Sequence, residues 1–218
     1  MTYTFPMLGR RDLMGLAATA LAAAAPWRPA AAGVPGDAGA SAPIEQLDAA
    51  LLAAMKAGRN TPFAQRFAAL APVIDQTFDL DAVLAASVGV SWSAVPSDQQ
   101  ARLRDTFRRY TVASYAANFD SYSGQTFQVL PTVRSVGNGE VVVSTKLIPT
   151  DGSARKLDYV MRNGQSGWKA VDVLADGAIS RVAVQRSDFR QLLANGGAPA
   201  LAVALQQKVA NLSDGVLT

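Results

Sequence analysis

Residues 167–197, GWKAVDVLADGAISRVAVQRSDFRQLLANGG, contain the side chains of this sequence that are best suited to chemistry. They include three aspartates and three arginines: Asp172, Asp176, Asp188, Arg181, Arg186 and Arg190. General acid–base catalysis needs two carboxyl groups with separated pKa values, and guanidinium groups bind anions. Asp172 and Asp176 lie four residues apart at an expected strand end, so they are a candidate catalytic pair. Asp176-Gly177 is equally typical of a turn, and the residues alone leave both interpretations open.

The composition excludes most other catalytic machinery. The 218 residues include no histidine and no cysteine, which rules out Ser-His-Asp triads, imidazole ligands, thiol nucleophiles and disulfides. No phosphate-binding glycine loop, dinucleotide fingerprint or calcium loop occurs in the sequence. We therefore expect no cofactor and no metal site.

Two further charged groups have structural explanations. Asp75, Asp79 and Asp81 lie close together, but Asp79 precedes an apolar run and predicts a helix N-cap. The arginines of residues 102–109 suit the solvated face of a helix, with intrahelical ion pairs. A phosphate or headgroup patch on this helix is the functional alternative.

Residues 1–32 predict an export signal. Paired arginines at positions 10 and 11 precede an apolar run, and three alanines end the segment at Ala32, a small-residue cleavage site. The run is shorter than the roughly 20 residues that cross a membrane. The arginine pair resembles a twin-arginine signal; a Sec signal and an uncleaved anchor are the alternatives. Cleavage would remove three arginines and one aspartate and lower the net charge from +3 to +1, so no nucleic-acid partner is expected.

The elements that must position these side chains follow from hydrophobic periodicity and turn residues. Residues 33–43 predict a flexible lead-in and residues 44–218 a single domain. Expected helices span residues 44–56, 63–71, 80–88, 97–122, 188–193 and 199–212, with a new segment beginning at Pro72. Expected strands span residues 125–137, 139–149, 155–163 and 167–177. This order predicts an α+β fold, with an antiparallel meander of four to five strands covered by helices on one face, as in an NTF2-like cone.

The apolar face of this sheet has two possible roles. Alternate residues from Val141 to Leu147, and Leu157, Tyr159 and Met161, share its apolar side. Core packing alone would explain them. An apolar cavity between sheet and helices would also explain them, and because a cavity forfeits packing free energy it usually exists for a ligand.

Residues 158–197 resemble the MlaC-type periplasmic lipid carriers, the auxiliary components of toluene-tolerance ABC transporters. The family's strand–turn–strand–helix signature corresponds here to Tyr159, Gly167, Trp168, Lys169, Asp172, Val173, Gly177, Ala178, Ser180, Arg186 and Phe189. Upstream, Tyr122-Ser-Gly-Gln resembles the Y-x-G-Q that ends a family helix. The resemblance extends over about residues 44–212, and the arginine-containing signal fits the hopanoid-associated, HpnM-like branch.

The resemblance implies a periplasmic carrier that holds phospholipid or hopanoid tails between sheet and helices. Such a carrier binds lipid without catalysis, so we predict no catalytic residue and no enzymatic activity. Its implied partners are an outer-membrane lipoprotein complex and the inner-membrane substrate-binding protein of an ABC transporter. The residues expected to line the cavity are Phe107, Tyr110, Tyr115, Val143, Leu147, Tyr159, Met161, Val171 and Val173. An NTF2-like enzyme that uses Asp172 or Asp176, and a structural adaptor without lipid, are the alternatives.

Overall fold

The structure is a computed structural model that describes residues 39–217, which belong to one compact unit, Gly33–Thr218. The predicted signal (1–32) and most of the predicted lead-in lie outside the described residues. The helices of the described part are α1 (Ala42–Ala57), α2 (Phe63–Thr77), α3 (Leu80–Val88), the 3₁₀ helix η1 (Gly89–Ala94), α4 (Ser97–Asn118) and α5 (Arg181–Leu212).

A single five-stranded sheet forms from the second half of the chain. Its order is β1-β2-β3-β4-β5 with every neighbouring pair antiparallel, which confirms the predicted meander. The strands are β1 (Thr126–Gly137), β2 (Glu140–Ile148), β3 (Arg155–Gly164), β4 (Gly167–Ala175) and β5 (Ile179–Ser180). The β1–β2 turn places Asn138 and Gly139 at positive φ, 53° and 73°, as a type I′ turn requires.

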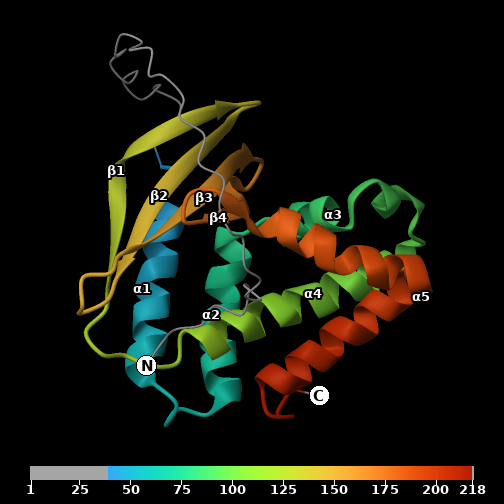
Figure 1. Ribbon diagram of the computed structural model, residues 1–218, viewed down its shortest axis with the longest axis horizontal. Coiled ribbons are helices and arrows are strands. Elements are labelled where there is room, and N and C mark those ends of the chain that lie inside the picture. Colours follow the sequence, from blue (N-terminus) through green and yellow to red (C-terminus); the bar gives the residue numbers. More distant parts are fainter. Residues whose placement is uncertain (1–38, 218) are drawn as a thin grey trace, which may run out of the picture. The chain divides into compact units, whose positions relative to one another are not determined.

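Helices cover one face of this sheet, which confirms the predicted α+β architecture. Figure 1 shows α1 lying across the inner face of the strands with α2 beside it, and the packing of α1 on β1 and of α2 on β4 agrees. Apolar side chains from α1, α2, the second half of α4 and strands β2–β4 form one buried cluster, which we call the sheet core.

A second buried cluster, the helical core, lies among α3, the first half of α4 and α5. Leu103 and Phe107 of α4 belong to it, whereas Val112 and Ala116 of the same helix belong to the sheet core. The 22-residue α4 therefore joins the two cores.

Three predicted helix boundaries are wrong. The helix expected over residues 97–122 ends at Asn118. Pro72 does not start a new segment but lies inside α2, because the packing of Leu70, Ala71 and Ile74 in the sheet core outweighs the lost backbone hydrogen bond. Pro72 itself is exposed, so water can bind the carbonyl group that it leaves free.

The helix after the sheet begins at Arg181 and not at Asp188. The N-cap is Ser180, whose hydroxyl accepts a hydrogen bond from the Ala183 amide. The predicted break before Pro199 is present as a kink at Gly197, where φ is 63°. The Asp79 cap is confirmed by a 3.0 Å hydrogen bond from the Ala82 amide.

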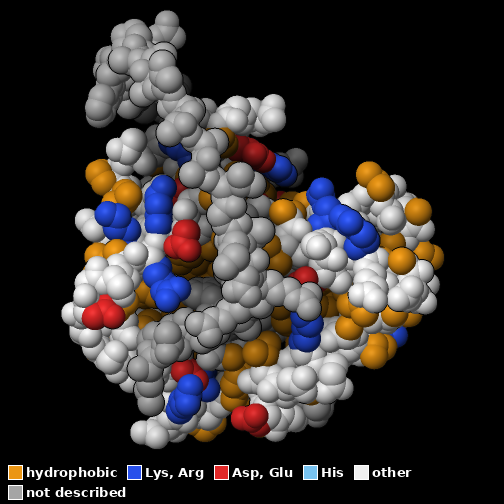
Figure 2. All heavy atoms as spheres, viewed as in Figure 1, with side chains coloured by type: hydrophobic (Ala, Val, Ile, Leu, Met, Phe, Trp, Pro, Cys, Tyr) orange, Lys and Arg blue, Asp and Glu red, His pale blue; other side chains and the backbone are white. Residues whose placement is uncertain are grey.

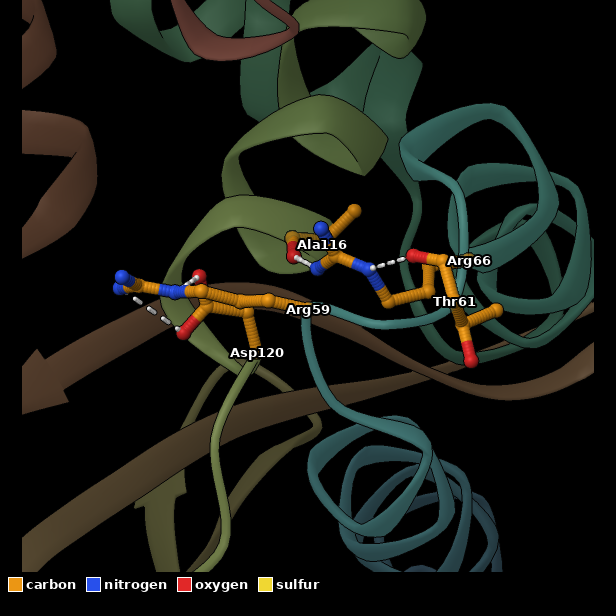
Figure 3. A network of polar contacts seen from close by, with 5 residues as sticks. All are labelled: Arg59, Thr61, Arg66, Ala116 and Asp120. Atoms are coloured by element: carbon orange, nitrogen blue, oxygen red, sulfur yellow. Dashed lines mark hydrogen bonds and ion pairs between the residues drawn. The ribbon is translucent and has the colours of Figure 1, made fainter.

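Figure 3 shows how the buried Arg66 fastens the start of α2 to the end of α4. Its guanidinium donates hydrogen bonds to the Thr61 carbonyl, at 3.2 Å, and to the Ala116 carbonyl. The Ala116 carbonyl lies in the last turn of α4, where helix carbonyls lack an intrahelical donor and the helix dipole favours a cation. Nearby, Arg59 and Asp120 form an ion pair at 2.7 Å in which the arginine is largely exposed.

We expect Arg66→Ala to lower the free energy of unfolding by about 2–4 kcal/mol, because it leaves two carbonyl groups without their donor and empties a buried volume. Arg59→Ala is the matched control and should cost less than about 1 kcal/mol, since the Arg59 side chain is 76% exposed. Urea denaturation of both variants measures the difference. Equal losses would show that Arg66 does not hold the α4 terminus.

Candidate functional site

The inner face of the sheet is a continuous apolar surface built from cross-strand pairs. Val143 of β2 pairs with Val133 of β1 and with Tyr159 of β3, which in turn pairs with Val173 of β4. Val143 and Tyr159 are almost completely buried. Towards the margins the cover is less complete, and the half-buried apolar residues of the strands are Phe127, Val129, Val133, Leu157, Trp168 and Val173.

A chain of aromatic rings crosses from the sheet to the helices. Tyr159 lies 6.4 Å from Phe78, between ring centroids, and Phe78 lies 5.8 Å from Tyr115 of α4. Tyr115 stacks on Phe119 at 5.9 Å, and Phe119 contacts Phe127 of β1. Such pairs stabilise beyond their buried area, so the rings fix the distance between α4 and the strands.

One carboxyl group lies within this apolar interior. Asp48 of α1 is 6% exposed, and neither of its side-chain oxygens has a hydrogen-bond partner among the described residues. Burial, with a smaller contribution from the charge of Glu45, raises the pKa of Asp48 to about 7. The carboxyl group therefore changes its charge close to neutral pH.

Asp48 interacts electrostatically with polar groups of other elements. Its negative charge adds to the burial that raises the pKa of Tyr115 and of Tyr159, so both phenols lie within electrostatic range of it. The positive charge of Arg181, at the start of α5, opposes this rise in the pKa of Tyr115. Arg181 also donates a hydrogen bond to the Tyr110 hydroxyl at 3.3 Å.

The residues expected to line a cavity do not all lie together. Val143, Leu147, Tyr159 and Met161 belong to the sheet core, and Tyr115 and Val173 pack at its edge. Phe107 instead belongs to the helical core, where it meets Phe189 edge to face at 6.5 Å, and Tyr110 packs beside it.

Val171 differs from the other eight because it lies at an irregularity of β4. Val160 of β3 pairs with Asp172 and the next residue, Met161, pairs with Ala170, so Val171 is the extra residue of a β-bulge. Val171 is buried but belongs to neither core. The bulge returns Val173 to the apolar face, opposite Tyr159.

The two aspartates considered for catalysis, Asp172 and Asp176, have structural roles. Asp172 accepts hydrogen bonds from the Ser180 hydroxyl at 2.5 Å and from the amides of Val173 and Val182, so its two oxygens secure the start of α5. Asp176 is exposed and has a φ of 51°, which is typical of the turn that it forms with Gly177. The two side chains therefore have separate structural roles.

The described residues also form a groove of about 1050 Å³ on the helical core, away from the sheet. It lies between α3, η1 and the kinked α5, and its lining includes Val90, Leu193, Arg186 and Arg190. Figure 2 shows basic and hydrophobic side chains next to one another over this part of the molecule. The guanidinium of Arg186 donates two hydrogen bonds to the Ala86 carbonyl, at 2.9 and 2.6 Å.

Within residues 39–217, no group of three or more acidic side chains is arranged to hold a metal ion. No helix in the same range is long and apolar enough to cross a membrane.

The open antiparallel sheet, the helices on one of its faces and the apolar interior place this protein among the α+β proteins. Comparison with known families and solved structures identifies its relatives. The chain belongs to the MlaC family: the family model described as MlaC protein matches residues 45–207. The fold is also similar to that of the phospholipid-binding protein from Ralstonia solanacearum, whose structure was solved in complex with a phospholipid. That match has a TM-score of 0.69 and 22% identity, and it covers 80% of this chain and 98% of the other.

Asp48 and Phe78 were not expected among the site residues, although each has a signal in the sequence or the fold. Asp48 occupies an apolar position of α1, four residues after Ile44 and three before Leu51, where a charged side chain breaks the stripe. Phe78 immediately precedes the helix cap at Asp79, and a parallel bridge to Ala170 brings it onto the sheet. The contact between Phe78 and Ala170 joins residues far apart in the sequence, so no local sequence pattern predicts it.

The raised pKa of Asp48 makes stability depend on pH. Between about pH 4 and pH 7 the folded protein retains a proton that the unfolded chain releases, so the free energy of unfolding falls as pH rises through this range. Asp48→Asn removes this ionisation. We expect it to be more stable than the parent at pH 8 by about 2–4 kcal/mol, and similar to the parent at pH 4.

Urea denaturation of the parent and of Asp48→Asn at several pH values measures this difference. Asp48→Leu, which also removes the ionisable group, should show the same flattened dependence. Parallel pH curves for parent and variants would mean that Asp48 is not desolvated.

Proposed function

We propose that this protein is a periplasmic lipid carrier that holds acyl chains between the inner face of its sheet and the helices. The observation that carries the proposal is the apolar inner face, whose marginal side chains, including Val133, Leu157 and Val173, are only half covered by the helices. Acyl chains laid against this face would complete its burial. Membership of the MlaC family and the fold shared with a phospholipid-binding protein support this assignment.

The energetics of acyl-chain burial favour a carrier over a protein that releases lipid into water. Each methylene group removed from water contributes about 0.8 kcal/mol, so a lipid with two long chains would leave the protein very slowly. Release then requires a docked partner. We propose as partners an outer-membrane lipoprotein complex and the inner-membrane substrate-binding protein of an ABC transporter, between which the protein shuttles phospholipid or hopanoid.

Binding without catalysis agrees with the chemistry of the described residues. The carboxylates of Asp172 and Asp176 serve a helix start and a turn, and the sequence offers no histidine or cysteine to act with them. These observations favour a lipid carrier over an NTF2-like enzyme. The incompletely covered apolar face favours it over a structural adaptor without lipid.

Mass spectrometry of the native protein, purified without detergent, should detect bound phospholipid or hopanoid. We expect Val173→Asp to reduce lipid occupancy at least about tenfold, because it places a carboxylate against the acyl chains. The proposed function would be contradicted if the parent protein is purified without lipid and also takes up no lipid from added phospholipid vesicles.

Val90→Asp is the matched control, because it makes the same substitution in the groove on the helical core. Val90 is 98% exposed and lines that groove, so the change should leave folding intact. Unchanged lipid occupancy in this variant would support the sheet face as the binding site. Loss of lipid in Val90→Asp but not in Val173→Asp would transfer the site to the groove.

A further inference from the structure

Asp48 occupies a position where a carboxyl group lowers stability. It faces inwards from α1 at the position between Ile44 and Leu51, both of which are fully buried. Its two oxygens have no hydrogen-bond partner among the described residues. A buried polar group without a partner destabilises the fold, and a leucine of similar size would suit the apolar stripe better. Packing therefore does not explain the aspartate.

The surroundings of Asp48 provide the other half of a hydrogen-bonding site. Glu45 precedes it on α1, and the phenols of Tyr115, which packs against the sheet core, and Tyr159, which belongs to it, lie within electrostatic range of Asp48. The positive charge of Arg181 acts on Tyr115. A hydroxyl group needs one acceptor and one donor. A carboxyl oxygen of Asp48 supplies the acceptor, and a tyrosine hydroxyl supplies the donor.

The chemistry favours a neutral hydroxyl over a charged headgroup. An ammonium group would need a permanent negative charge beside it, whereas burial keeps much of the Asp48 carboxyl protonated up to neutral pH. A phosphate group would be repelled by the charge of Glu45 and by the ionised form of Asp48. Removing a hydroxyl group from water costs less free energy than removing a charged group. A hydroxyl group also hydrogen-bonds to either protonation state of the carboxyl group.

We propose that Asp48 determines cargo specificity, and that the site takes a lipid with a hydroxyl group within its hydrocarbon part, which hydrogen-bonds to Asp48 and to Tyr115 or Tyr159. This inference rests on the proposed function, since it assigns the kind of lipid that the sheet face binds. A lipid whose buried part is pure hydrocarbon leaves the carboxyl group without a partner and binds less tightly.

The test compares lipids that differ only in one hydroxyl group. Delipidated protein is titrated with phosphatidylglycerol that carries two stearoyl chains, and with a series in which one chain has a hydroxyl group at a different carbon in each member. We expect at least one hydroxylated lipid to bind the parent about tenfold more tightly than the unmodified lipid. Several positions are needed because the carbon that lies beside Asp48 depends on the depth of the chain.

Three variants relate the preference to the side chain. Asp48→Leu should lose the preference and bind the unmodified lipid more tightly, and Asp48→Ala, which cannot overpack the interior, should lose the preference as well. Asp48→Asn keeps a hydrogen-bonding side chain and should retain it. Circular dichroism and thermal unfolding of each variant establish that it is folded before its affinities are compared.

The outcomes separate this inference from the proposed function. If the parent binds no lipid of the series, the proposed function fails. If it binds all of them equally, or if the preference persists in Asp48→Leu and Asp48→Ala, only the role of Asp48 is overturned. A preference that follows the headgroup when phosphatidylethanolamine replaces phosphatidylglycerol, and that is lost in Asp48→Leu, would overturn the hydroxyl assignment in favour of an ammonium group.

Discussion

The structure depends on one constraint: an open antiparallel sheet with one apolar face must bury that face against something else. The strands β1 to β4 present a nearly unbroken apolar surface, and α1, α2 and the end of α4 cover its centre. They leave its margins half covered. The same constraint thus concerns both the sheet core and the incompletely buried surface to which we assign the lipid.

Local patterns were sufficient to predict the elements whose signals are local. Alternating apolar residues and paired turn residues such as Asn138-Gly139 predicted four strands and their order, and Asp79 predicted a helix start. The predicted helix boundaries were wrong where contacts between residues far apart in the sequence determine the backbone conformation. Pro72 stays helical because its neighbours pack in the sheet core, and α5 starts early because Asp172, from β4, binds the amide of Val182.

The candidate site was predictable in part for the same reason. The strand residues Val143 and Tyr159 were correctly expected to share a face, because the period of a strand is two and its register follows from the turn. Phe107 and Tyr115 lie eight residues apart on one helix, and helical periodicity cannot reveal that α4 crosses from one core to the other between them. The assignment of Phe107 and Tyr115 to different cores therefore becomes visible only in the folded structure.

Asp48 is a charged residue at a position of α1 where the pattern of the helix requires an apolar one. Natural sequences usually agree at every level, and the exceptions concentrate where function requires them. A carboxyl group among Ile44, Leu47 and Leu51 weakens the fold at neutral pH, since burial disfavours its charged form. Cargo that desolvates the carboxyl group further would favour its protonated state, so under our proposal lipid binding and proton uptake at Asp48 would be thermodynamically linked. A carrier built in this way would bind its cargo less tightly as pH rises above neutrality.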